Sequence, residues 1–162
     1  MDQEPDVPQV RPPTIDDVRR LCRALDQAQA RYVLIGGFAV ILHGGERTTK
    51  DVDLLVDPAP DNVDRLKRAL AVLEDDAAKE IDRGDLQKYT VVRVADEIMV
   101  DLLAAACGVT WAEANAQAER MNVQGISVNV ADRRTLIRTK QTVRPSDAAD
   151  RAWLEALLEE DV

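Results

Sequence analysis

The chain of 162 residues has few of the residues that mark several common classes of protein. Its two cysteines, Cys22 and Cys107, lie far apart and lack the spacing of a zinc site. No apolar run reaches the length of a membrane span, and the acidic, proline-bearing N-terminus lacks the hydrophobic region of a signal peptide. We therefore expect both cysteines to be reduced packing residues, the protein to be cytoplasmic, and no membrane to be involved.

Positive charge and aromatic residues are also scarce. Lys and Arg number 21 against 30 Asp and Glu, and the net charge of −9 argues against general binding to duplex nucleic acid. The only dense basic stretch runs from Arg133 to Arg151, and it is either a local nucleic-acid patch or a solvated helix face. Aromatic residues make up 3% of the chain, and we expect Trp111 and Trp153 to pack in the interior rather than stack on bases.

What remains is enough apolar residue, 46% of the chain, for one folded domain. Residues 1–13 hold four prolines and several acids and predict a flexible tail, which leaves 14–162 as the domain. Thr14 and Asp17 resemble a capping box, and Asp61, Thr110, Asp132 and Ser146 are the expected starts of further helices. Strands are expected at 32–35, 51–56, 86–94, 97–103 and 123–130. These elements predict an α/β (α+β) fold with a mixed β-sheet flanked by helices.

The segment from residue 32 to residue 56 carries the clearest functional signal. A short buried strand ends at Gly36 and Gly37, whose amides can come close to a phosphate because neither residue has a side chain. Asp51 and Asp53 follow at positions i and i+2, which point to the same face of a strand. Two adjacent like charges favour a cation, most simply magnesium shared with substrate phosphates. The alternative is a solvated edge strand whose polar face is acidic.

Three further residues extend this site. Arg47 and Thr49 continue the series of alternate residues that ends with the two aspartates. If the strand begins as early as Arg47, all four side chains point to the same site, and Arg47 could neutralise phosphate charge there. Asp101 is a single carboxylate in an apolar strand and needs a metal, a basic partner or water. It is a candidate metal ligand or general base, or else an aspartate that caps the turn before residues 104–106.

These residues resemble a known pattern. It is that of the nucleotidyltransferase superfamily typified by DNA polymerase β, in particular its AbiEii-type toxin branch, over about residues 31–151. The resemblance is carried by Gly36-Gly37, Arg47-x-Thr49-x-Asp51-x-Asp53 and the later Asp101. It implies that the glycines hold a nucleoside triphosphate and that Asp51 and Asp53 bind two divalent ions, Mg²⁺ or alternatively Mn²⁺. It further implies that Asp101 helps to activate an acceptor hydroxyl.

The chain departs from this pattern at two positions. Gly37 stands where the superfamily often has serine, and Ser146 stands where the AbiEii branch usually has lysine in the motif matched by Arg144 to Asp150. Two other residues allow more than one interpretation. The single histidine, His43, either caps a short helix or contacts substrate, and Lys140 either reaches a nucleotide phosphate or is an ordinary surface lysine.

The sequence thus predicts a metal-dependent enzyme that moves a nucleoside monophosphate from a nucleoside triphosphate to an acceptor hydroxyl. The acceptor stays open. It is tRNA or protein for an enzyme of the toxin–antitoxin type, which would have an antitoxin partner, or a small molecule such as an aminoglycoside. A non-catalytic nucleotide-binding module is a third alternative, disfavoured because such a module has no physical need for three mutually repelling carboxylates.

Overall fold

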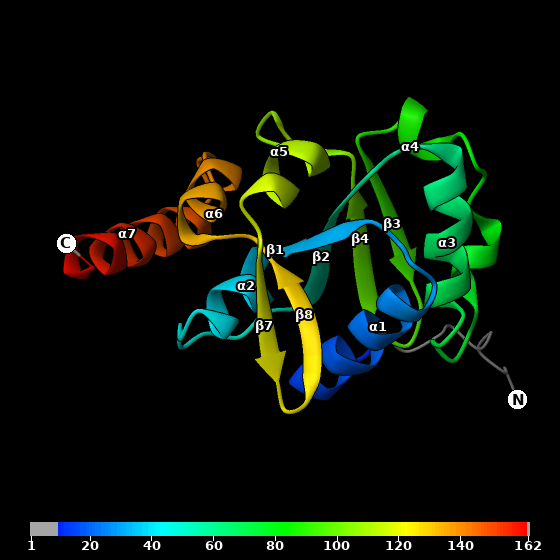
Figure 1. Ribbon diagram of the computed structural model, residues 1–162, viewed down its shortest axis with the longest axis horizontal. Coiled ribbons are helices and arrows are strands. Elements are labelled where there is room, and N and C mark those ends of the chain that lie inside the picture. The colour runs from blue at the N-terminus through cyan, green and yellow to red at the C-terminus, as the bar shows by residue number, and fades with distance from the viewer. Residues whose placement is uncertain (1–9, 162) are drawn as a thin grey trace, which may run out of the picture.

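A six-stranded mixed sheet, with strand order β3-β4-β2-β1-β8-β7, forms the centre of the computed structural model, which describes residues 10–161 (Figure 1). Its strands are β1 Tyr32–Ile35, β2 Asp51–Val56, β3 Val91–Ala95, β4 Met99–Leu103, β7 Glu119–Val123 and β8 Ile126–Val130. The pairs β2–β4 and β1–β8 are parallel, whereas β1–β2, β3–β4 and β7–β8 are antiparallel. The predicted mixed sheet is confirmed. A separate two-stranded ribbon joins β5 Ala105–Ala106 to β6 Val109–Thr110.

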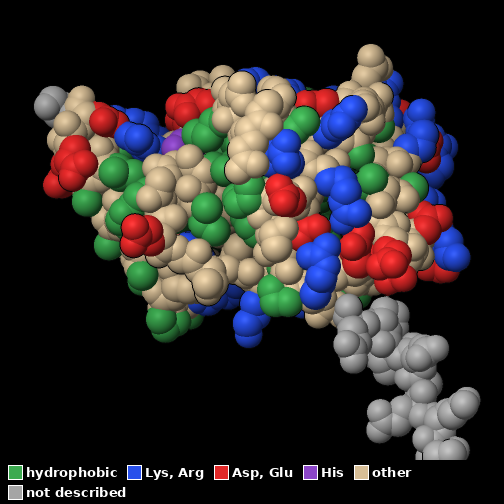
Figure 2. Space-filling model, turned by 90° about the horizontal axis from the view of Figure 1, so that it is seen from below, with side chains coloured by type: hydrophobic (Ala, Val, Ile, Leu, Met, Phe, Trp, Pro, Cys, Tyr) green, Lys and Arg blue, Asp and Glu red, His purple; other side chains and the backbone are tan. Residues whose placement is uncertain are grey.

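Helices flank this sheet. They are α1 Ile15–Gln27, α2 Gly36–Leu42, α3 Pro60–Leu70, α4 Asp85–Lys88, α5 Trp111–Ala116, α6 Arg133–Thr139 and α7 Pro145–Glu160, with a 3₁₀ turn at Ala77–Glu80. The α1 helix packs on α3 and β8, α5 packs on β1, and α6 contacts α7, which points away from the sheet (Figure 1). None of the helices within residues 10–161 is long and apolar enough to cross a membrane. On the face drawn in Figure 2, acidic and basic side chains are interspersed.

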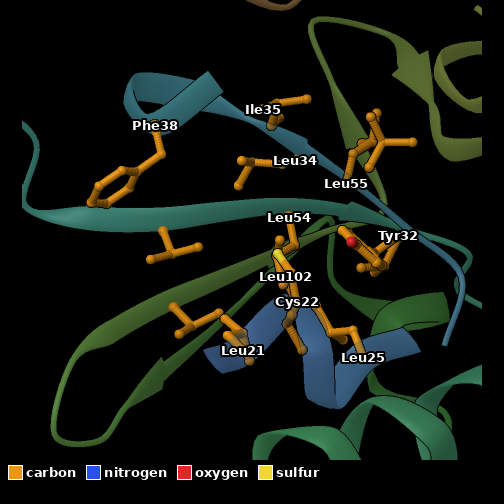
Figure 3. Packing of buried hydrophobic residues seen from close by; sticks show 14 of the residues in the cluster. Leu21, Cys22, Leu25, Tyr32, Leu34, Ile35, Phe38, Leu54, Leu55 and Leu102 are labelled. Atoms are coloured by element: carbon orange, nitrogen blue, oxygen red, sulfur yellow. The ribbon is translucent and has the colours of Figure 1, made fainter. Parts of the chain in front are cut away.

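The core forms where α1 meets the sheet. Leu21, Cys22 and Leu25 point from α1 toward Leu54 of β2 and Leu102 of β4, and all five are fully buried (Figure 3). Cys22 is therefore the packing residue that its position predicts. Cys107 is exposed, so its predicted packing role is wrong: it lies in the turn between β5 and β6 with φ 47°.

Helix starts follow two different rules. The predicted capping box is present, because Thr14 N–H donates to Asp17 at 2.7 Å and Asp17 N–H donates to the Thr14 hydroxyl at 3.3 Å. Thr110 and Asp132 also cap as predicted. Asp61 and Ser146 do not. The helices α3 and α7 instead begin one residue earlier, at prolines, whose fixed φ suits the first helical position.

Two predicted strands differ from the structure. The strand expected at 86–94 begins only at Val91, because residues 85–88 form α4, anchored by the single buried side chain Leu86. The strand expected at 123–130 is instead a hairpin. It turns at Gln124 and Gly125, which both have positive φ, and pairs β8 with the mostly polar β7.

Most of the predicted N-terminal tail lies outside the described residues. Within residues 10–13, the Arg11 backbone N–H donates to the Glu97 carbonyl at 3.0 Å, and the Arg11 guanidinium pairs with Asp17 at 2.6 Å. The side chain of Pro13 is buried. Residues 11–13 therefore contact the folded part of the chain.

Candidate functional site

The parallel pairing of β2 with β4 brings three carboxylates together. Asp53 is the register partner of Asp101, and Asp51 precedes Asp53 by two residues on the same face of β2. Val52 and Leu54, which alternate with them, are fully buried in the core. One oxygen from each of Asp51, Asp53 and Asp101 lies within 4.8 Å of the others. The oxygens of this acidic triad fit a hard cation such as Mg²⁺, which takes oxygen ligands.

The surroundings of Asp53 are unfavourable for a negative charge. Burial and, to a lesser extent, the neighbouring carboxylates of Asp101 and Asp51 together raise its pKa to about 7, although the positive charge of Lys140 acts in the opposite direction. In these surroundings Asp53 binds a proton near neutral pH. A cation among the three carboxylates would favour the ionised form instead.

The two glycines leave room for the side chains beside them. A Cβ on Gly36, whose φ is 73°, would lie 2.2 Å from Asp53 Oδ2. A Cβ on Gly37 would lie 2.6 Å from the Cβ of Thr49 and 2.7 Å from its hydroxyl. The side chain of Thr49 thus fills the space that a serine at position 37 would need. This packing gives a physical reason for the departure at Gly37.

Arg47 and Thr49 reach the site from a loop rather than from a strand. The β2 strand begins only at Asp51, so residues 47 and 49 precede it and the alternation of side chains along a strand does not determine where they point. Thr49 is held by its hydroxyl, which donates to the Asp51 carbonyl at 3.2 Å. Arg47 is held by an ion pair with Asp150 of α7.

One cavity of about 960 Å³ joins these parts. It is lined by all the residues singled out from the sequence as catalytic, metal-binding or nucleotide-binding, namely Gly36, Gly37, Arg47, Thr49, Asp51, Asp53, Asp101 and Lys140. Arg93, Cys107, Arg144 and Ser146 also line it. His43 does not; its Nε2 lies 2.8 Å from the Ala131 carbonyl, and the residue caps the C-terminus of α2.

Lys140 is not a surface lysine. Its side chain is 5% exposed, and its ammonium lies 3.0 Å from Asp150 and 3.7 Å from Asp147. Asp150 also pairs with Arg47, so one buried carboxylate joins both basic residues. The segment from Arg144 to Asp150 therefore contributes to the site in two ways: Arg144, Ser146 and Asp147 line the cavity, and Asp147 and Asp150 pair with Lys140. Sequence reasoning missed the pairing of these two aspartates with Lys140, although they are spaced i and i+3 and so lie on the same face of a helix.

Arg93 is the second residue that sequence reasoning missed. It lies on β3 directly opposite Asp101, and its guanidinium contacts both oxygens of Asp101, at 2.8 and 3.0 Å. It also lies 3.4 Å from Asp51. These contacts raise the pKa of Arg93 above its ordinary value. Strands were expected at 86–94 and 97–103, but the register that places Arg93 beside Asp101 depends on the turn at residues 96–98.

The basic stretch from Arg133 to Arg151 does not face the cavity as a whole. Arg133 pairs with Asp161 and Arg138 pairs with Glu113, while Arg151 donates to the Thr142 carbonyl at 3.1 Å. From this stretch, Lys140 and Arg144 are the basic residues that line the cavity.

Comparison with known proteins adds two findings. The profile of a family described as nucleotidyl transferase AbiEii toxin, type IV TA system, matches residues 19–140. Among solved structures, a candidate nucleotidyltransferase of Thermotoga maritima is similar, with a TM-score of 0.57 and 14% identity, over 91% of this chain and 96% of that one. At this identity the likeness concerns the fold. A search of the curated proteins found no match.

Proposed function

The chain belongs to the AbiEii family of nucleotidyltransferases, and from this premise we propose that it uses divalent cations to transfer a nucleoside monophosphate from a nucleoside triphosphate to an acceptor hydroxyl. The observation that carries the proposal is the approach of Asp51, Asp53 and Asp101 within 4.8 Å on one wall of a large cavity. A purely structural role would leave three neighbouring acids without a reason, because their mutual repulsion costs stability.

The triad would hold the cations. Asp51 and Asp53 are the expected ligands of two magnesium ions, with Asp101 as a further ligand, and Mn²⁺ suits the same oxygen donors. The bound ions would neutralise charge on the attacking and leaving oxygens of the displacement. Asp101 faces Asp53 across the strand pair, where its carboxylate can accept the proton of an acceptor hydroxyl.

Other residues of the chain would position the triphosphate. Gly36 and Gly37 let the ligand approach the backbone, because no side chain covers the chain there. Arg47 and Lys140 place positive charge on the cavity wall, and Asp150 fixes the position of both. Thr49 adds a hydroxyl beside Gly37.

Family membership also supports a toxin–antitoxin role. In that role the acceptor would be tRNA or a protein, and an antitoxin would be the partner. A small hydroxylated acceptor of the aminoglycoside kind is the alternative, and the cavity of about 960 Å³ has room for either a nucleotide end or a small molecule beside the triphosphate.

Incubation of the purified protein with each α-labelled nucleoside triphosphate, Mg²⁺ or Mn²⁺, and separate pools of RNA, protein and aminoglycosides tests the proposal. We expect label on one pool, with loss of transfer in Asp51→Asn and Asp53→Asn. Asp64→Asn is the matched control, since Asp64 pairs with Arg83 at the surface. Transfer that survives in Asp51→Asn and Asp53→Asn, or no transfer to any pool, would contradict the proposed function.

A further inference from the structure

Arg93 occupies a position that the proposed chemistry leaves unexplained. Its guanidinium bridges two members of the acidic triad, namely Asp101, its register partner on β4, and Asp51 of β2. Among residues 10–161, no other basic side chain forms an ion pair with the triad. The fork of Arg93 thus satisfies both oxygens of Asp101, which are the oxygens that a cation would need.

We propose that Arg93 is a built-in counter-ion that competes with free divalent cations for the triad and turns to the triphosphate when a cation–nucleotide complex enters. The proposal rests on the proposed function, since it assumes that the triad takes cations and the cavity takes a triphosphate. Its consequence is selective loading. The site would admit a cation together with its nucleotide and disfavour a cation alone.

The competition follows from geometry. The Arg93 guanidinium lies 2.8 and 3.0 Å from the two Asp101 oxygens, so its positive charge repels a cation that binds either of them. Arg93 cannot yield by losing its proton, because a guanidinium stays charged in proteins. It can yield only by moving. Its side chain is 55% exposed and long, so movement is open to it, whereas Lys140 is enclosed at 5% exposure.

The second step follows from position. Arg93 lines the same cavity as the triad, so a fork released from Asp101 remains beside any phosphate that shares the triad's cations. Arginine binds phosphate oxygens through two parallel hydrogen bonds, as it binds a carboxylate here. The incoming triphosphate therefore replaces the partner that Arg93 gives up. A free cation offers no such replacement.

Binding of Mn²⁺ without nucleotide, measured by electron paramagnetic resonance, tests the first step. We expect Arg93→Gln to bind Mn²⁺ about fivefold more tightly than the wild type, as the loss of a partly exposed ion pair implies. Arg120→Gln is the matched control. Arg120 is also a strand arginine, 54% exposed, and forms a fork on Asp26 at 3.0 and 3.1 Å. The Arg120→Gln variant should bind Mn²⁺ as tightly as the wild type does.

Binding of a non-hydrolysable triphosphate with Mg²⁺ tests the second step. Here Arg93→Gln should bind about tenfold more weakly than the wild type and Arg120→Gln, because one charge-assisted phosphate contact is lost. Arg93→Lys keeps the charge without the fork, so it should stay closer to the wild type in Mn²⁺ binding than in nucleotide binding. If Arg93→Gln fails to fold, Arg93→Lys can be used in its place to test both steps.

The outcomes separate this inference from the proposed function. If the wild type binds Mn²⁺ but Arg93→Gln binds it no more tightly, competition by Arg93 is overturned. If Mn²⁺ affinity rises while nucleotide affinity stays unchanged, the turn toward the triphosphate is overturned. If the wild type binds neither Mn²⁺ nor the nucleotide complex, the proposed function itself fails.

Discussion

At the scale of single residues, Asp53 shows that ionisation of a carboxyl group in this site is unfavourable. Its pKa is about 7 in the folded chain against an ordinary value of 3.8, because it is largely withdrawn from water and lies beside two other carboxylates. Between these pH values the folded state binds a proton that the unfolded state does not. The contribution of Asp53 to stability therefore falls as pH rises from about 4 to about 7.

The corresponding prediction compares the wild type with Asp53→Asn in the presence of a chelator. The asparagine variant cannot ionise, so its advantage in free energy of unfolding should grow with pH by up to ~1.4 kcal/mol per unit across that window. Urea denaturation at several pH values measures the difference. Parallel stability profiles for the two proteins would show that Asp53 does not titrate abnormally.

Gly36 gives a second prediction at this scale. Gly36→Ala puts a Cβ 2.2 Å from the Asp53 carboxylate and forces alanine to φ 73°, so we expect a loss of about 1–3 kcal/mol in stability together with loss of transfer. Gly84→Ala is the control, because nothing lies within 4 Å of a Cβ at that position. Equal melting temperatures and equal transfer in the two variants would contradict the close approach of Gly36 to Asp53.

At the scale of elements, α7 holds the basic side of the cavity. Asp150 pairs with Lys140 and with Arg47, which lies in the loop before β2. Asp150→Asn removes the ion pair of Arg47 and leaves the buried Lys140 ammonium with Asp147 alone, 3.7 Å away, so we expect a loss of about 3 kcal/mol in unfolding free energy. Asp161→Asn removes a more exposed ion pair near the end of the same helix and should change stability little. Similar urea midpoints for both variants would refute the role of Asp150.

The elements also show what the sequence could reveal. Asp51 and Asp53 were predictable because strand parity depends only on neighbouring residues. The placement of Asp101 also held, since its apolar strand had to be buried in the sheet. Arg93 was not predictable, because its contact depends on the register of a hairpin. The strand β7 was missed because it is a mostly polar strand at the edge of the sheet, so its sequence shows little alternation between apolar and polar residues.

At the scale of the whole molecule, the net charge of −9 means that an RNA acceptor needs locally placed positive charge. Arg144 lines the cavity, whereas Arg138 pairs with Glu113 outside it. If RNA is the acceptor, Arg144→Glu should weaken transfer to RNA more than Arg138→Glu does. Added salt should reduce the difference, because it screens the attraction. Transfer assays at two ionic strengths measure this, and equal effects of the two variants would count against an RNA acceptor at the cavity mouth.

The central claim is that the triad formed by β2 and β4 holds the divalent cations of a nucleotidyltransferase. Anomalous diffraction from crystals grown with Mn²⁺ and a non-hydrolysable nucleoside triphosphate tests it most directly. The account predicts Mn²⁺ peaks in contact with the carboxylates of Asp51, Asp53 and Asp101, phosphates beside Gly36 and Gly37, and an Arg93 guanidinium that has left Asp101. Bound nucleotide with no Mn²⁺ at these carboxylates would contradict the account.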